Sequence, residues 1–142
     1  MTSAESNTPD HPEALTPYAR SLGIAVHGHE SDVPVLCVPF DSIVEGRPGF
    51  FHGGATGGLL ETAGYAALRA ALAERDEQPQ LKPINITVQY LAPAKNETTY
   101  AKARITKLGR RNANIAVEAW QGDRTRPVAT AVMNILMAEP KD

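Results

Sequence analysis

The sequence predicts an α+β domain in which a curved antiparallel sheet of about six strands wraps around one long central helix. Two observations lead to this prediction. Small and apolar residues recur at helical spacing in the middle of the chain, and segments with strand character lie on both sides of that run. An antiparallel sheet must cover its apolar face, and only this helix is apolar enough to do so.

The N-terminal region predicts a leader and a short helix. Residues 1–12 are polar and rich in Ser, Thr, Asn and Pro, so we expect a loose leader in front of a single domain formed by residues 13–142. Helical spacing begins after Pro12 and ends at Gly23, a residue type that favours helix C-termini.

A hairpin and a loop are expected next. Residues 24–29 and 33–40 are extended in character and are separated by turn-forming residues. Pro34 and Pro39 argue that the second of these strands lies at a sheet edge, because proline cannot donate to a strand ladder. Residues 41–51 contain Gly and Pro and predict a loop that ends at His52.

The central helix is predicted from His52 to about Arg75. Leu59, Ala63 and Ala70 recur at helical spacing, and nearly every side of the helix is small and uncharged as far as Leu68. We therefore expect a helix that is buried almost all round and wrapped by the rest of the fold.

Four strand-like segments follow, and their short connections predict an antiparallel meander. These segments alternate apolar and polar residues or are continuously apolar, and they occupy residues 84–90, 100–108, 113–119 and 128–138.

Composition excludes several classes of protein. Fourteen Lys and Arg residues face 16 Asp and Glu residues, for a net charge of −2, which gives no electrostatic reason to expect a nucleic-acid partner. The chain has no apolar run of about 18 residues that could span a membrane. The polar N-terminus is no secretory signal, and the one cysteine, Cys37, cannot form an internal disulfide, so the cytoplasm is the expected location.

Glu61 is the first candidate functional residue. It is the only residue between His52 and Leu68 that carries a full charge at neutral pH. A carboxylate on an apolar, buried helix is costly unless it is paired, solvated or protonated, so Glu61 is either a reacting group or an ion-pair partner at a boundary.

Gly53 and Gly54 stand where the long helix should begin. The first N–H groups of a helix have no internal acceptor, and glycine lets a ligand oxygen approach them closely. Gly53 and Glu61 are eight residues apart, about 12 Å along a helix, which is too far for both to touch one reacting atom. Catalysis by this pair therefore requires two antiparallel copies of the helix across a two-fold axis.

Two blocks of sequence resemble a known family. The block from His52 to Ala63 resembles the signature of hot-dog-fold acyl-CoA thioesterases, and in particular the PaaI-like group of the phenylacetate pathway. The segment from Tyr90 to Ala94 and the turn Gly109–Arg111 are also similar to that group. The likeness runs from about Tyr18 to the C-terminus.

This resemblance implies a homo-oligomeric thioester hydrolase, a dimer or tetramer with its active sites at a subunit interface and no metal or other cofactor. The backbone N–H of Gly53 would hold the thioester carbonyl, and Glu61 of the partner subunit would activate water or attack directly. His52 would orient the loop or contact the substrate. Gly54 and Thr62 belong to the same block and are expected to contact the substrate.

The sequence departs from the family pattern at three positions. Glu61 stands where the PaaI-like group commonly has Asp, Gly46 where some members have Asn, and Pro83 near the place of a water-orienting Ser or Thr. We expect the polar side chain of Asn85 or of Thr87, on the same strand, to take the place of that Ser or Thr.

Coenzyme A carries phosphates, so a basic patch is expected. Lys107, Arg110 and Arg111 at a hairpin turn could supply it, although a solvated turn has the same composition. His27 and His29 lie two residues apart without a third ligand at a suitable spacing, so no metal site is expected.

The leading hypothesis is hydrolysis of a small to medium acyl- or aryl-CoA thioester by carboxylate-assisted attack of water. The alternatives are a non-catalytic acyl-CoA binding module on the same fold and a hydratase that acts on an enoyl thioester. The acyl group, and the choice between dimer and tetramer, cannot be read from the chain.

Overall fold

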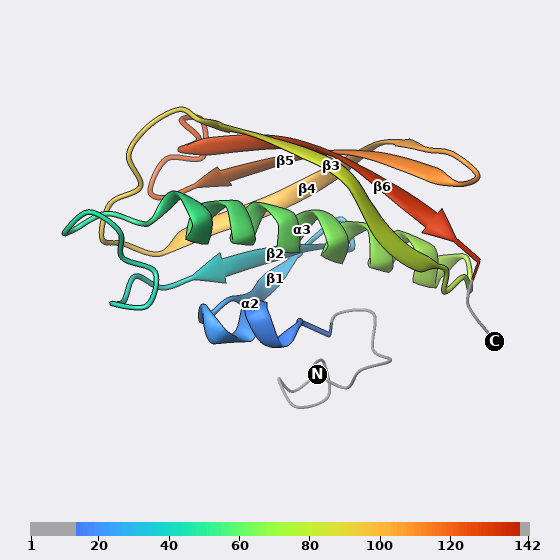
Figure 1. Ribbon diagram of the computed structural model, residues 1–142, viewed down its shortest axis with the longest axis horizontal. Coiled ribbons are helices and arrows are strands. Elements are labelled where there is room, and N and C mark those ends of the chain that lie inside the picture. Colours follow the sequence, from blue (N-terminus) through green and yellow to red (C-terminus); the bar gives the residue numbers. More distant parts are fainter. Residues whose placement is uncertain (1–13, 140–142) are drawn as a thin grey trace.

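The computed structural model describes residues 14–139 and contains six strands and one long helix within that range. Figure 1 shows the long helix α3 lying along one face of a twisted sheet. The sheet is antiparallel, with strand order β1-β2-β4-β5-β6-β3. The predicted α+β class is confirmed, and the expected leader, residues 1–12, lies outside the described residues.

The first described element is the short helix α2 (Pro17–Ser21). The Thr16 hydroxyl accepts the Ala19 N–H at 3.1 Å, and Pro17 at the first helical position has a suitable φ, so the helix begins here and not at Pro12 as expected. It ends as predicted, because Gly23 adopts a left-handed conformation with φ 85°.

Strands β1 (Ala25–Glu30) and β2 (Val33–Val38) form the expected hairpin. The prediction that the second strand lies at an edge is wrong, because β2 pairs with both β1 and β4. Pro34 is tolerated since it faces only β1, before the β2–β4 pairing begins at Val35, and Pro39 follows the end of the strand.

Helix α3 (Gly53–Glu74) begins and ends within one residue of the predicted limits. Its N-cap is His52, and it ends before Asp76, which has φ 55°. Leu59, Leu60 and Leu68 are fully buried against the sheet.

The inner face of the sheet beneath α3 consists largely of small side chains. Six buried alanines on β4, β5 and β6 belong to the same core as the helix leucines. Gly64 of α3 lies so close to Met133 that a Cβ there would meet the methionine sulfur. The helix therefore packs very closely on the sheet. The six alanines are Ala101, Ala103, Ala113, Ala119, Ala129 and Ala131.

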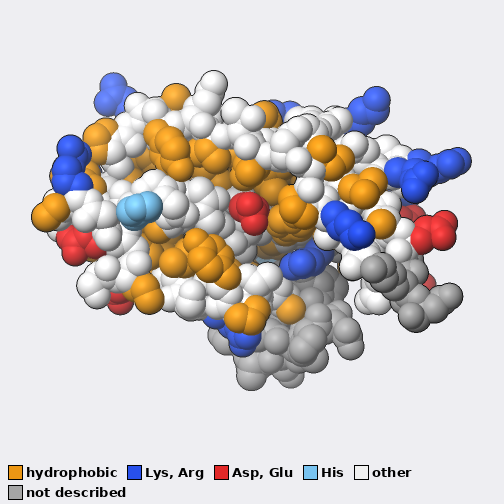
Figure 2. Space-filling model, viewed as in Figure 1, with side chains coloured by type: hydrophobic (Ala, Val, Ile, Leu, Met, Phe, Trp, Pro, Cys, Tyr) orange, Lys and Arg blue, Asp and Glu red, His pale blue; other side chains and the backbone are white. Residues whose placement is uncertain are grey.

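The expectation that α3 is buried all round is wrong for the single chain. Glu61 is exposed, and Gly57, Thr62 and Tyr65 are half-buried on the side turned away from the sheet. Figure 2 shows hydrophobic side chains gathered on this face of the molecule. Small residues on a helix do not by themselves require cover on every side.

The four C-terminal strands are β3 (Gln80–Tyr90), β4 (Thr99–Leu108), β5 (Asn112–Trp120) and β6 (Ala129–Ala138). The predicted meander is correct for β4, β5 and β6 but wrong for β3, which pairs with β6 and forms the far edge of the sheet. Pro83 is acceptable there because an edge strand has a free side, and the pairing shifts register between Pro83 and Asn85.

Candidate functional site

The N-terminus of α3 presents one backbone donor without a partner. The Gly54 N–H donates to Nδ1 of His52 at 2.9 Å, and the N–H groups of Ala55 and Thr56 donate to the His52 carbonyl at 2.9 and 3.2 Å. The Gly53 N–H has no hydrogen-bond acceptor among residues 14–139. Gly53 is therefore free to bind a ligand oxygen, whereas the Gly54 N–H is occupied.

His52 acts on this N-terminus as a cap. Its Nδ1 is the acceptor in this contact, which leaves Nε2 as the ring nitrogen that faces away from the helix. The resemblance implies that His52 either orients the loop or contacts the substrate. The contacts in this structure are those of a residue that orients the loop. The loop itself is fixed, since the His52 N–H donates to the Val44 carbonyl at 2.7 Å and Val44 is buried.

Glu61 lies two turns further along α3, on the open side of the helix. Burial raises the pKa of Tyr65, one turn beyond, and the negative charge of Glu61 raises that pKa further. Tyr65 in turn contacts Arg69, whose guanidinium carbon is 5.7 Å from the ring centroid. The carboxylate is thus solvated in the single chain and has no cation among its recorded contacts within the described residues.

A cavity of about 530 Å³ opens beside Gly53. Aromatic and aliphatic side chains from the loop before α3 and from the end of β3 line most of it, and the guanidinium of Arg47 lies 4.3 Å from the Phe50 ring centroid at one wall. The cavity suits an apolar group next to the free N–H. Its lining includes Phe50, Phe51, Gly53, Thr56, Tyr90 and Leu91.

Tyr90 was not predicted as a site residue. Its hydroxyl donates to the Gly53 carbonyl at 2.8 Å, and a Cβ on Gly53 would lie 3.4 Å from the Tyr90 ring. These two residues are 37 positions apart, and the alternating pattern of β3 says nothing about which helix residue a strand end will meet. The contact could be found only from the fold.

Two expected substrate contacts have other partners in the structure. The Thr62 hydroxyl donates to the Gly58 carbonyl at 2.6 Å, within α3. Asn85 accepts a hydrogen bond from Asn134 at 2.9 Å on the sheet face turned away from α3, and Thr87 also faces that side. The structure therefore does not bring Asn85 or Thr87 to the Glu61 side of its own chain.

The basic residues Lys107, Arg110 and Arg111 are exposed at the β4–β5 turn, as expected. Strand pairing places this turn level with Lys82 of β3. Lys82 is eight residues from Tyr90, which is hydrogen-bonded to Gly53 at the start of α3. At roughly 3.3 Å per residue, the turn therefore lies about 26 Å from the start of α3. Within one chain, the basic turn and Gly53 lie at opposite ends of the helix.

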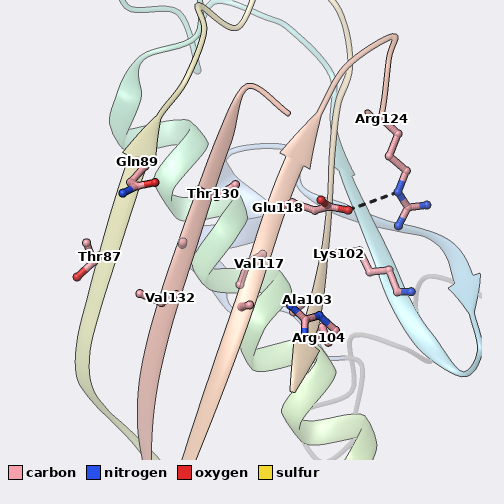
Figure 3. Close-up of a pocket in the computed structure, with 12 residues that line it drawn as sticks. Thr87, Gln89, Lys102, Ala103, Arg104, Val117, Glu118, Arg124, Thr130 and Val132 are labelled. Atoms are coloured by element: carbon pink, nitrogen blue, oxygen red, sulfur yellow. Dashed lines mark ion pairs between the residues drawn. The ribbon is translucent and has the colours of Figure 1, made fainter. Parts of the chain in front are cut away.

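The sheet face opposite α3 carries a second cavity, of about 420 Å³. Figure 3 shows its polar side chains on the strands, with α3 behind the sheet. Arg124 pairs with Glu30 at 2.7 Å and with Glu118 at 3.6 Å, and Lys102 pairs with Glu30 at 3.4 Å. This cavity is separated from Gly53 and Glu61 by the thickness of the sheet.

The described residues include neither a cluster of metal-binding side chains nor a helix that could span a membrane. Between residues 14 and 139, no group of three His, Cys, Asp or Glu side chains could hold a metal ion. His27 instead lies edge-on to Tyr100, with ring centroids 4.9 Å apart. No helix in the same range is long and apolar enough to cross a membrane.

Comparisons with known proteins agree with the fold and with the block at the start of α3. Residues 48–128 match the family model of the thioesterase superfamily. No curated protein sequence matches the chain.

Several solved structures are similar to this chain in fold. A protein from Chromobacterium violaceum is 30% identical with a TM-score of 0.68, covering 89% of this chain and 87% of that chain. A thioesterase family protein from Silicibacter pomeroyi is 22% identical with a TM-score of 0.74, covering 88% and 91%. A phenylacetic acid degradation-related protein from Ralstonia eutropha JMP134 is 21% identical with a TM-score of 0.71, covering 88% and 93%.

The family match spans more than half of the 142 residues and includes His52, Gly53 and Glu61. The chain therefore belongs to the thioesterase superfamily and is a thioester hydrolase with the hot-dog fold.

Proposed function

We propose that the protein hydrolyses a small to medium acyl- or aryl-CoA thioester at a site shared by two subunits. The observation that carries this proposal is the pair formed by Gly53 and Glu61. A free N–H and a solvated carboxylate lie on the same open side of α3, two turns apart.

The distance between these groups requires a second copy of the chain. Eight residues of helix separate them by about 12 Å, so one carbonyl cannot contact both within one chain. Two antiparallel copies of α3 would place Gly53 of one subunit near Glu61 of the partner subunit.

The surface around α3 supports such a homo-oligomer. Strand β3 has a free edge, where a second copy could extend the sheet. Ile84 on this strand is 51% exposed and Tyr90 at its end is 58% exposed. Large apolar side chains at an open sheet edge are typical of an interface.

The reaction follows from the charges that develop. The thioester oxygen would accept a hydrogen bond from the Gly53 N–H, which stabilises the negative charge of the tetrahedral intermediate. Glu61 of the partner subunit would either take a proton from the attacking water or attack the carbonyl itself. Both routes consume one water and release a carboxylic acid and the CoA thiol.

The substrate class rests on the cavity beside Gly53 and on the basic turn. The apolar lining suits an acyl or aryl group, in agreement with the resemblance to the PaaI-like group and with the name of the Ralstonia structure. Lys107, Arg110 and Arg111 lie near the C-terminal end of α3, beyond Glu61, and the first turn of an antiparallel partner helix would point toward them, so they could bind CoA phosphates.

The first experiment measures thiol release from a panel of acyl- and aryl-CoA thioesters. Glu61→Gln keeps the shape of the side chain and removes the carboxylate, and Gly53→Pro removes the backbone donor and adds a ring. Proline suits the first position of a helix, and His52 already has the extended backbone (φ −65°, ψ 137°) that a residue before proline needs. Gly53→Ala, which keeps the N–H, is the matched control.

A mixing experiment tests whether the site is shared. Neither Glu61→Gln nor Gly53→Pro should turn over alone, but subunits refolded together should recover about a quarter of natural activity, because half of the dimers are mixed and each has one intact site. No recovery would contradict a shared site. Binding of CoA thioesters by the natural chain without thiol release would overturn hydrolysis in favour of a binding module.

A further inference from the structure

A single peptide group at the start of α3 is held at both of its polar ends by side chains. The carbonyl of Gly53 accepts the Tyr90 hydroxyl at 2.8 Å, and the N–H of Gly54 donates to Nδ1 of His52 at 2.9 Å. These two backbone groups belong to the same peptide unit. Its position is therefore set by a loop residue on one side and by a strand residue on the other.

This peptide unit needs such support because of its sequence. Two successive glycines have no Cβ to restrict their backbone, and they occupy the first turn, where N–H groups lack helical acceptors. Without outside contacts, this turn would sample many directions for its free N–H. The two side-chain hydrogen bonds limit that freedom.

Tyr90 connects the first turn of α3 to the sheet. It is the last residue of β3, where it pairs with Ala129 of β6, and the next N–H in the chain, that of Leu91, donates to the Val128 carbonyl at 2.8 Å. A Cβ on either Gly53 or Gly57 would lie 3.4 Å from Tyr90, so the ring lies close beside the first turn of the helix to which its hydroxyl is hydrogen-bonded. Tyr90 also lines the cavity beside Gly53.

We propose that Tyr90 is a positioning residue for the reaction, which fixes the direction of the free Gly53 N–H by holding the adjoining peptide group against the end of β3. The inference rests on the proposed role of Gly53 as the donor to the thioester oxygen. A donor that is fixed before the reaction stabilises developing charge more effectively than one that must be ordered during it.

The test compares Tyr90→Phe with Tyr18→Phe. The first change removes the hydroxyl that binds Gly53 and keeps the ring. Tyr18 is a matched control because it is 59% exposed and its ring also lies close beside α3, 3.2 Å from where a Cβ on Gly58 would be. Its hydroxyl has no recorded hydrogen-bond acceptor within residues 14–139.

For Tyr90→Phe, we expect kcat to fall on the order of tenfold because the donor loses its fixed direction. KM should stay within about twofold, since we expect the hydroxyl to support the transition state and not the binding of the substrate. Amide exchange measured by NMR should become faster at Gly54 and Ala55 and stay unchanged in the middle of α3. Tyr18→Phe should change none of these quantities.

Several outcomes would overturn the inference. An unchanged kcat for Tyr90→Phe, or a rise in KM that accounts for the whole loss of kcat/KM, would assign the hydroxyl no positioning role. An equal loss in both tyrosine variants would indicate a general effect on the helix. Failure of the proposed function is recognised separately, because the natural chain itself would then release no thiol, and the inference would fall with it.

Discussion

Gly46 stands where some related enzymes have Asn, and the structure gives a steric reason for the glycine. A Cβ at this position would lie 2.9 Å from the Cα of His52 and 3.1 Å from its Cβ. Carbon atoms in contact prefer about 3.5–4.0 Å. Neither backbone can easily retreat, because Gly46 donates to the Phe50 carbonyl at 3.0 Å and His52 donates to the Val44 carbonyl at 2.7 Å.

The substitution Gly46→Ala should therefore destabilise the protein and slow the reaction. Overpacking of a fixed contact costs about 1–3 kcal/mol. The smaller entropy of the unfolded chain offsets about 0.4–1 kcal/mol of this. The net loss of about 1–2 kcal/mol corresponds to a fall in Tm of roughly 3–8 °C for a chain of this size. Movement of His52 should also disturb its cap on Gly54 and lower kcat.

Calorimetry and thiol release together test this reasoning, with Gly28→Ala as the control. Gly28 lies in β1 with nothing within 4 Å of its Cβ position and without a left-handed backbone. That variant should be as stable as the natural chain or slightly more stable, by up to about 1 kcal/mol. If Gly46→Ala matched Gly28→Ala in both Tm and kcat, the close approach of the loop to His52 would not be the reason for the glycine.

Three further substitutions test other parts of the structure. Glu61→Gln should lower kcat at least about a hundredfold, while the free energy of unfolding changes by less than about 0.5 kcal/mol because the side chain is exposed. The same change should lower the pKa of Tyr65 in an NMR titration of its ring, since the charge of Glu61 helps to raise it; an unchanged Tyr65 pKa would contradict their coupling. The hydrogen bond from Arg124 is the largest cause that lowers the pKa of Glu30 in the folded protein. This pair therefore stabilises the fold at pH values above the pKa of Glu30 in the unfolded chain. The stabilisation is lost as the pH falls through the lower pKa of the folded protein. Arg124→Ala should accordingly reduce Tm more at neutral pH than in acid, and an equal deficit at both would count against this linkage. Thr16→Ala should cost about 1 kcal/mol through loss of the α2 cap, measured by denaturant unfolding, and no loss would show that the cap is not needed.

Helix α3 and most strand limits could be predicted because periodicity records which residues face the core. Spacing alone located a helix from His52 to about Arg75, and the structure has it from Gly53 to Glu74. Partner choice is different, since alternation along β3 does not say which strand lies beside it. Pairing of β3 with β6, and the internal place of β2, depend on the whole sheet.

The candidate site was predictable in part for the same reason. The free N–H of Gly53 follows from the rule that helix N-termini lack acceptors, and Glu61 was conspicuous as a charge on an apolar helix. The location of Asn85 could also have been read from the sequence, because it alternates with Ile86 and so faces away from the core. The contact of Tyr90 with Gly53 could not, since it joins residues that only the fold brings together.

The alanine layer beneath α3 has a consequence for how this protein could acquire a new substrate. Larger side chains in that layer would lift the helix and would move Gly53 and Glu61 together, so the two groups of the proposed site cannot be altered independently of the core. The cavity beside Gly53, in contrast, is bounded mostly by the loop before α3 and by the segment after β3, and only its remaining wall comes from the first turn of α3 and from Tyr90. If this cavity holds the acyl group as proposed, changes at Phe50 and Leu91 can alter its size while the spacing of Gly53 and Glu61 stays unchanged.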